Sequence, residues 1–380
     1  MDSIYLDSAA TTAVDPGVLA AMLPWFQADF GNPSSIHATG RRARGAVDEA
    51  RDAVAQLIGS AYSEITFTSG GTEADNLAIL GVLLAAPPER NHVVISAIEH
   101  HAVLHAGRLA RQLGFRVTEV APDTNGVLAA DRVAAALDAG TALVSVMHGN
   151  NEIGTLQPIA QIADVAHAIG AWLHTDAVQS AAVQPVDVDE LRCDLLSLSA
   201  HKMHGPKGAG ALYVRTGVPV SALMVGGAQE RERRAGTENV PAIVGFGVAA
   251  NQTRRWVRTD GPATVGTLRD GVETAIQSAL PGVTIHGADA ARMPHISSFR
   301  LDGVDGATLL MNLDRRGIAA SSGSACSSGS IEPSHVLTAL GIHRRDASGG
   351  VRLSLSRTTS AEELTAAVQA VCEISAQLQR

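Results

Sequence analysis

The stretch DLLSLSAHKMHGPKGAGALYV, residues 194–214, joins two apolar runs through a turn that contains Lys202. The first run, which ends at Ser199, is typical of a buried strand. A lysine at the end of such a strand points into a crevice, but lysine is otherwise a surface residue, so taken alone Lys202 could equally be a solvated loop charge. The turn GPKGAG is not a P-loop, because it lacks the spacing of that motif and the hydroxyl residue after the lysine.

Short β-branched runs alternate with helical patterns on both sides of this stretch, from about residue 65 to residue 214. The runs are EITFT, HVVISA, ALVSVMH, AWLHTD, DLLSLS and AGALYV. Their alternation with helices predicts an α/β fold with a mostly parallel sheet. Apolar residues recur at the spacing of one helix face over residues 43–57, and Gly59 stands where a C-terminal cap would end that helix. After residue 251 the runs HISSFRLDG and VRLSLS and a helix from about Ala361 predict a smaller α/β domain.

Composition excludes several classes of protein. The 380 residues carry a net charge of −9 without a run of lysines or arginines, so we expect neither extended nucleic-acid binding nor a membrane surface as partner. The start MDSIYLDSAATT resembles no targeting peptide, and no stretch is apolar for the length of a membrane span, which predicts a cytoplasmic protein. Three cysteines without paired spacing favour free thiols over a disulfide framework.

Two further segments could bind charged groups, the first an anion and the second a cation. In EITFTSGGTEADN a strand runs into Gly71 and Thr72 and then a helix, which leaves amides and a hydroxyl for one phosphate. Turns from a strand to a helix also often contain glycine merely because its backbone adopts conformations that other residues avoid. In WLHTDAVQS, Asp176 ends a strand and Gln179 follows within one turn. Asp176 could hold a protonated ring nitrogen or could merely cap a helix.

The segment SSGSACSSGS, residues 321–330, places Cys326 among glycines and serines, without apolar residues to cover it. Such a segment is either a surface linker or a flexible loop that carries a working thiol. Cys193 and Cys372 are expected to be core thiols. His101 and His105 are four residues apart, but the glutamate of a zincin motif is missing, so we expect no metal site.

Together, a lysine at a strand end, an aspartate 26 residues before it and a phosphate cradle are the parts that bind pyridoxal 5'-phosphate. The chain closely resembles the NifS/IscS-type cysteine desulfurases over nearly its whole length. The motifs are LDSAATT, GNPSSIH, TSGGTEADN, EHHAVL, NNEIGTLQP, HTDAVQS, SAHKMHGPKG, RAGTEN and SSGSACSSGSIEPSHVL. The resemblance implies a pyridoxal-phosphate-dependent transferase fold of type I, in the class V aminotransferase family. Its large domain, residues 16–250, would hold a mostly parallel seven-stranded sheet, and residues 1–15 and 251–380 would form a small domain with the catalytic cysteine loop.

The resemblance also implies a role for individual residues. Lys202 would form the covalent bond to the cofactor, Asp176 would pair with the pyridinium nitrogen, Gln179 would bond the ring hydroxyl, and His100 would stack on the ring and move protons at the substrate thiol. Cys326 would be the nucleophile that accepts sulfur. The implied phosphate ligands are Gly71, Thr72, Ser199, His201 and, from a second subunit, Thr237. Asn151, also counted among the cofactor contacts, and Arg352 would lie near the substrate carboxylate.

The implied reaction converts L-cysteine to L-alanine and leaves a persulfide on Cys326, which a protein acceptor receives. The acceptor could serve iron-sulfur cluster assembly or the thiolation of tRNA or DNA. The resemblance also implies a homodimer. The chain stops at QLQR, whereas many family members continue into a tail that helps dock a scaffold. Alternatives are a selenocysteine lyase or a related class V aminotransferase, which would not need Cys326 for turnover on cysteine, and an inactive scaffold that kept the fold.

Overall fold

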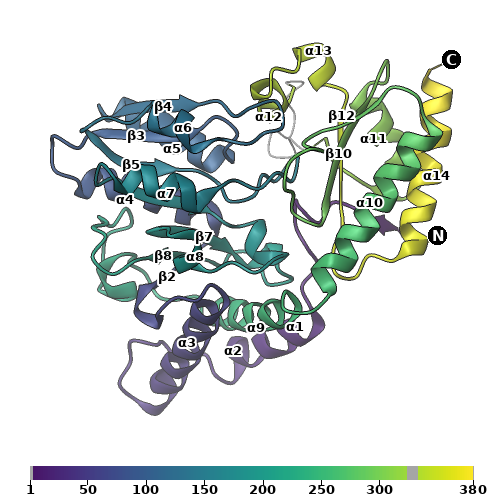
Figure 1. Cartoon of the computed structure of the whole chain (residues 1–380). Coiled ribbons are helices and arrows are strands. Elements are labelled where there is room, and N and C mark those ends of the chain that lie inside the picture. The colour runs from purple at the N-terminus through teal and green to yellow at the C-terminus, as the bar shows by residue number, and fades with distance from the viewer. Residues whose placement is uncertain (1–2, 323–332, 380) are drawn as a thin grey trace.

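The computed structural model describes residues 3–322 and 333–379. Its centre is a seven-stranded sheet with the order β2-β8-β7-β6-β5-β3-β4 (Figure 1). Only β8 runs antiparallel to its neighbours. The bounds are β2 Ile65–Thr68, β3 His92–Ser96, β4 Arg116–Val120, β5 Thr141–Ser145, β6 Trp172–Asp176, β7 Leu195–Ser199 and β8 Gly210–Val214. The mostly parallel, seven-stranded sheet is thus confirmed.

Six of these strands coincide with the six apolar runs of the sequence, and β4 is the seventh. The inner strands are buried on both faces, apart from the half-buried Trp172 of β6, and therefore read as continuous apolar runs. In β4, at the edge of the sheet, Arg116 and Glu119 are exposed. The sequence pattern missed β4 because an edge strand with charged residues lacks the apolar run that marks a buried strand.

Helices cover both faces of the sheet. The core on one face comes from α4 (Gly71–Ala85) and α5 (His101–Gln112). The other core includes α1 (Pro16–Met22), α3 (Ala38–Leu57), α7 (Ile159–His167) and α9 (Val240–Trp256). The shorter helices are α2 (Pro24–Gln27), α6 (Ala130–Ala134) and α8 (Val188–Leu191), with 3-10 turns at Tyr62–Glu64, Ser180–Ala182, Ala200–Lys202 and Gln229–Glu232.

The helix predicted over residues 43–57 is α3, and it ends just before Gly59 as expected. Gly59 has a φ of 72°, and a Cβ atom there would lie 2.3 Å from Asp187 Oδ2. Only glycine therefore fits this cap without strain or displacement of Asp187.

A second, smaller body holds a three-stranded antiparallel sheet with the order β12-β10-β9 and a parallel pair, β1 with β11. The strands are β1 Ile4–Tyr5, β9 Val283–Ile285, β10 Ile296–Leu301, β11 Ile318–Ala319 and β12 Gly350–Ser354. The helices are α10 Gly261–Ala279, α11 Gly306–Arg315, α12 His335–Ala339, α13 Arg344–Ala347 and α14 Ala361–Leu378. Leu6 packs in the core of this body, so the N-terminal segment joins the C-terminal part of the chain.

The predicted domain boundaries stay predictions. Helix α9 crosses residue 250, and Trp256 at its end packs against the cores of both bodies. Helix α14 begins at Ala361 as expected, where Ser360 and Glu363 form a capping box.

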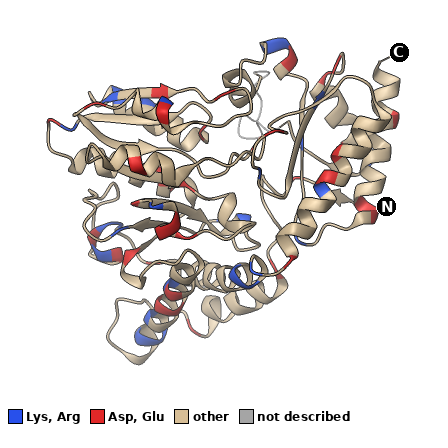
Figure 2. Cartoon of the chain, in the orientation of Figure 1, with Lys and Arg blue, Asp and Glu red and all other residues tan. Residues whose placement is uncertain are grey.

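Charge is distributed over the whole molecule. Figure 2 shows acidic and basic residues interspersed along the helices of the chain. Among residues 3–322 and 333–379, no helix is both long enough and apolar enough to cross a lipid bilayer.

Candidate active site

A cavity of about 370 Å³ lies where β6 and β7 end and α4 begins. It is lined by Ala9, Ala10, Gly71, Thr72, Asp75, His100, Met147, Gly149, Asn151, Asp176, Val178, Gln179, Ser199, His201, Lys202 and Arg352. All the predicted site residues are among these except two. Thr237 is exposed elsewhere, and Cys326 lies outside the described residues. The carboxyl ends of parallel strands are the usual place for a ligand in such folds.

Lys202 lies in the short turn Ala200–Lys202 that follows β7. Its Nζ donates hydrogen bonds to the backbone oxygens of Ala9, at 2.5 Å, and Ala10, at 2.9 Å. The N-terminal segment thus holds the amine at the wall of the cavity, and Lys202 is not a solvated loop charge.

Asp176 ends β6 and is only 6% exposed. Its Oδ1 accepts the amide of Val178 at 2.8 Å. Burial raises the pKa of Asp176 to about 6, although the Val178 amide and the charge of Lys202 act in the opposite direction. A buried carboxylate with a raised pKa favours a cation beside it. Gln179, one turn later, donates from Nε2 to the Ala9 oxygen at 2.7 Å.

The start of α4 supplies backbone donors for an anion. The residue at its N-cap, Gly70, has no side chain that could accept a hydrogen bond from the backbone amides of the first turn. A Cβ atom on Gly71 would lie 2.8 Å from the Val178 side chain, so the close approach requires glycine. Burial, followed by the charges of Lys202 and Lys207, lowers the pKa of His201 to about 4, so His201 is neutral at pH 7. A long helix that begins at a glycine is a suitable anion site.

His100 caps the N-terminus of α5. Its Nδ1 accepts the amide of Ala102 at 3.1 Å. Burial, and then the charge of Lys202, lowers the pKa of His100 to about 4. The ring is therefore neutral at pH 7, and because Nδ1 accepts, the ring proton is on Nε2.

Arg352 on β12 brings a guanidinium from the small body to the cavity. It is 2% exposed. Nη1 donates to the Asn151 oxygen at 2.7 Å, and Nη2 donates to Asp7 Oδ1 at 2.6 Å. A guanidinium fixed in this way is a suitable partner for a carboxylate.

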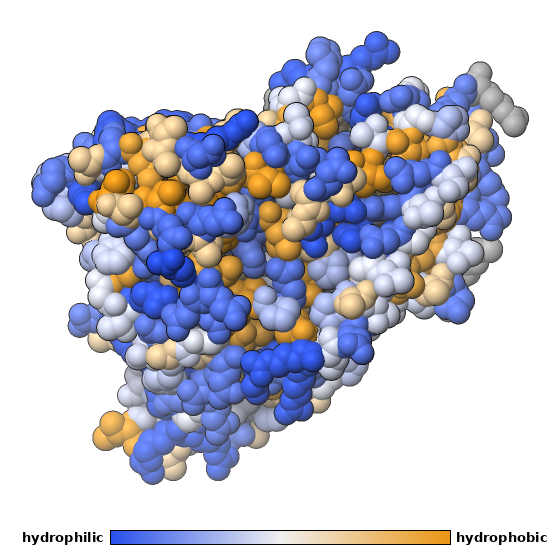
Figure 3. Space-filling view, in the orientation of Figure 1, coloured by the Kyte–Doolittle hydropathy of each residue, from blue (hydrophilic) through white to orange (hydrophobic). Residues whose placement is uncertain are grey.

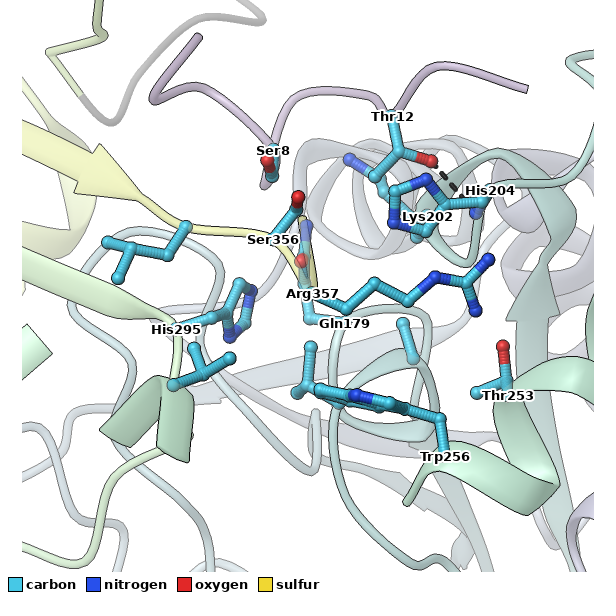
Figure 4. A pocket seen from close by; sticks show the side chains of 14 residues that line it. Ser8, Thr12, Gln179, Lys202, His204, Thr253, Trp256, His295, Ser356 and Arg357 are labelled. Carbon is cyan, nitrogen blue, oxygen red and sulfur yellow. Dashed lines mark hydrogen bonds between the residues drawn. The ribbon is translucent and has the colours of Figure 1, made fainter. Parts of the chain in front are cut away.

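A second cavity, of about 20 Å³, lies on another side of Lys202 (Figure 4). His295, Trp256 and Arg357 line it, and the His295 ring points into it. It has room for about one water molecule, so the larger cavity is the candidate active site.

Sequence reasoning missed several residues of the larger cavity. Ala9 and Ala10 act through backbone oxygens, which no side-chain pattern reveals. Asp75 lies three residues after Thr72 in α4, and this helical spacing, which puts both on one face, could have identified it.

The other cysteines and histidines do not form a site. Burial raises the pKa of both Cys193 and Cys372, so neither thiol favours the thiolate. The rings of His101 and His105 lie 5.3 Å apart. Within the described part of the chain, no three histidine, cysteine or acidic side chains are arranged to hold a metal ion.

The residues of the larger cavity fit pyridoxal 5'-phosphate. Lys202 can reach an aldehyde, Asp176 can face a protonated ring nitrogen, and the start of α4 with Ser199 and His201 can receive a phosphate. The cavity combines an amine, a carboxylic acid and an anion site, and it is large enough for a small cofactor.

Comparison with known proteins agrees with this site. Residues 4–366 match the family described as aminotransferase class-V. A cysteine desulfurase of Sinorhizobium fredii is 47% identical over 366 residues, which are 96% of this chain and 94% of that protein. Cysteine desulfurase IscS of Methanosarcina thermophila is 43% identical over 372 residues, 98% of this chain and 92% of that protein. A solved NifS-like protein superimposes with a TM-score of 0.92 at 34% identity, over 99% of this chain and all 100% of the other. The chain therefore belongs to the class-V aminotransferase family, among the pyridoxal-phosphate-dependent cysteine desulfurases of the NifS/IscS type.

Proposed function

We propose that this protein removes sulfur from L-cysteine at the larger cavity, releases L-alanine and carries the sulfur as a persulfide on Cys326. Membership in the cysteine desulfurases supports the overall reaction. One observation carries the assignment of the site: Asp176 and Lys202, at the ends of two consecutive strands, meet Arg352, 150 residues further along the chain, at one cavity.

Lys202 and Asp176 serve the proton chemistry. Pyridoxal 5'-phosphate, when bound, supplies an electron sink for the charge that develops at the substrate Cα. Lys202 Nζ removes a proton from Cα and returns it, and the oxygens of Ala9 and Ala10 orient the amine. Asp176, as the carboxylate, holds the ring nitrogen in its protonated form.

His100 and Arg352 orient the substrate. The Nε2–H of the neutral His100 ring is a hydrogen-bond donor toward the substrate sulfur, because Nδ1 accepts from the Ala102 amide. The Arg352 guanidinium, with Asn151 beside it, binds the substrate carboxylate.

Cys326 accepts the sulfur. Its thiolate attacks the sulfur of the substrate thiol, an S–S bond forms and the Cβ–S bond breaks. The electron pair of that bond stays with the carbon, which takes up a proton and becomes the methyl group of alanine. The next acceptor is a second protein. The IscS name of one relative supports iron-sulfur cluster assembly, and tRNA or DNA thiolation is the rival assignment.

A homodimer in the cytoplasm is part of the proposal. Thr237 is exposed in the single chain, which leaves it free to reach a partner's phosphate site. Figure 3 shows a largely hydrophilic face with scattered apolar residues. Large apolar side chains that are strongly exposed, as at an interface, are Phe26 at 61%, Phe30 at 74%, Ile36 at 90% and Val225 at 82%. Sedimentation at micromolar concentration should give a dimer, and a fully active monomer would contradict it.

The test of the proposed function is alanine formation by the wild-type protein and by Cys326→Ser, with L-cysteine and with L-selenocysteine. We expect the serine variant to bind cysteine and to stop before catalytic alanine formation. Normal turnover of cysteine by this variant would instead support a selenocysteine lyase or a related class V enzyme. A purified protein that neither binds the cofactor nor forms alanine would support the inactive scaffold.

A further inference from the structure

The end of the cavity that holds Asp176 contains a second carboxyl group, which the proposed function does not use. Asp75 of α4 lines the same cavity and is 1% exposed. Its Oδ1 has no hydrogen-bond partner within the described part of the chain and lies 3.7 Å from Nε2 of His174. The Ser197 hydroxyl also interacts with this carboxyl group. Asp75 is therefore a buried acid at the place where the cofactor ring would bind.

His174 does not supply a positive charge for Asp75. Its Nδ1 is 2.8 Å from the Ser145 hydroxyl, and its Nε2 is 3.0 Å from the Ser197 hydroxyl. Burial lowers the pKa of His174 to about 3, so the ring is neutral at pH 7.

The other ionisable groups around Asp75 also include more carboxyl groups than cations, and burial raises the pKa of the Glu99 carboxyl group well above its ordinary value. Strand β6 contributes Asp176 and His174, the segment between β3 and α5 contributes Glu99, the start of α5 contributes the neutral His100, and the turn after β7 contributes Lys202. Glu99 is fully buried and accepts the Met147 amide at 2.7 Å. Lys202 is thus the single cation among these groups, facing several carboxyl groups.

Two ionised carboxylates in one buried site repel each other and lose their hydration. One proton therefore remains on the pair, and the single remaining negative charge matches the positive charge of one protonated ring nitrogen. We propose that Asp75 is a positioning residue of the cofactor site, a second carboxyl group that stays protonated while Asp176 is ionised, so that the pair presents a single negative charge to the ring nitrogen. This inference rests on the proposed function, because it takes the larger cavity as the cofactor site.

The surroundings of the two carboxyl groups explain which of them keeps the proton. Asp176 accepts the Val178 amide and is attracted by Lys202, and both favour its ionised form. Asp75 has an Oδ1 without a hydrogen-bond partner among the described residues, and the charge of Asp176 raises its pKa by more than the hydrogen bond from Ser197 lowers it. Burial raises the pKa of Asp75 well above its ordinary value, and the charge of Asp176 raises it further. Asp176 therefore ionises first.

This arrangement has a consequence at alkaline pH. When Asp75 finally ionises, a second negative charge appears near the ring nitrogen and strengthens its hold on its proton. In Asp75→Asn this second charge is missing, while the shape of the neutral acid is kept. The variant should lose the ring proton at lower pH than the wild type does.

The first experiment uses infrared spectroscopy of the holoenzyme labelled with ¹³C in the aspartate carboxyl groups, at pH 7. We expect a carbonyl stretch from one un-ionised aspartic acid in the wild type and its disappearance in Asp75→Asn. The matched control is Asp194→Asn. Asp194 is another buried aspartate, at the opposite end of β7, and pairs with His167 at 2.8 Å. This control should keep the band. A wild type in which every aspartate is ionised overturns the proposal without any variant.

The second experiment follows the visible absorbance of the bound cofactor against pH. We expect Asp75→Asn to lose about tenfold in proton affinity of the ring nitrogen, a midpoint lower by about one pH unit, with Asp194→Asn unchanged. An unchanged midpoint in Asp75→Asn overturns the proposal while cofactor binding and alanine formation remain. A wild-type protein without bound cofactor would overturn the proposed function as well, so the two failures are distinguishable.

Discussion

The two ends of the cavity treat buried charge in opposite ways. Near β6, Asp75, Asp176 and Glu99 are buried, and among the described residues named around them Lys202 is the one cation. At the other end, the buried guanidinium of Arg352 is paired with Asp7 at 2.6 Å. A protein can leave buried charge unmatched where a bound ligand will supply the opposite charge, whereas a side chain that must be held in place for a substrate is matched in advance. On this view, the cofactor ring supplies the positive charge that the acidic end lacks, whereas the side chains of the basic end are already held in the arrangement that binds the substrate.

The largest expected effect follows from the amine that lies between the two ends. If the proposed function holds, Lys202→Ala removes the group that would bond the cofactor and move the Cα proton, so alanine formation should fall by at least about a thousandfold. Borohydride reduction and peptide mass spectrometry should then find no cofactor bound to the chain. The matched control is Lys207→Ala, an exposed lysine in the same turn. A Lys202→Ala variant with normal turnover would contradict the assignment.

A smaller effect is expected at the basic end. Arg352→Lys loses the planar fork that binds Asn151 and Asp7 together, so KM for L-cysteine should rise by about a hundredfold while kcat changes less. Steady-state kinetics measure both constants. Arg300→Lys is the control, because Arg300 lies on the neighbouring strand β10 and pairs at the surface with Asp302. An unchanged KM in Arg352→Lys would mean that Arg352 serves the fold and not the substrate.

The smallest effect concerns the stability of the protein stripped of cofactor. Burial raises the pKa of Asp176 from 3.8 to about 6, so the folded apoprotein binds this proton more tightly than the unfolded chain does. The stabilisation from this proton is complete below about pH 4 and is lost as the pH rises to about 6. Asp176→Asn should therefore stabilise the apoprotein at pH 7, by up to about 3 kcal/mol.

Urea unfolding of both apoproteins at several pH values measures this difference. It should vanish near pH 4, where the wild-type carboxyl group is protonated. The same substitution should weaken cofactor binding, so stability and binding change in opposite directions. A destabilised apo variant at pH 7 would show that the acidic end is not under electrostatic strain.

The sheet, and the two residues Asp176 and Lys202 of the acidic end, were predictable from the sequence, because a buried parallel strand is an apolar run and residues that follow such a run lie at the ligand edge, whereas Asp75 and Glu99 were not predicted. Asp176 and Lys202 were both found in this way. Strand β4 was missed, since its exposed Arg116 and Glu119 interrupt the apolar run.

The basic end was not predictable from local pattern. Arg352 lies on a strand of the small sheet, 150 residues after Lys202, and only the resemblance to a known family brought it into the site. The oxygens of Ala9 and Ala10 carry no side-chain signal, and their role depends on the N-terminal segment crossing the cavity. Contacts between the two bodies of the fold follow from tertiary packing and not from periodicity.

The most direct test of the central claim, that sulfur leaves the substrate at this cavity and moves to one cysteine, is peptide mass spectrometry after a single turnover with ³⁴S-labelled L-cysteine. We expect one labelled sulfur on the peptide of Cys326 for each alanine released, and unlabelled peptides for the buried Cys193 and the half-buried Cys372. Label on either of these two cysteines, or alanine released with free labelled sulfide and an unlabelled Cys326 peptide, would contradict it.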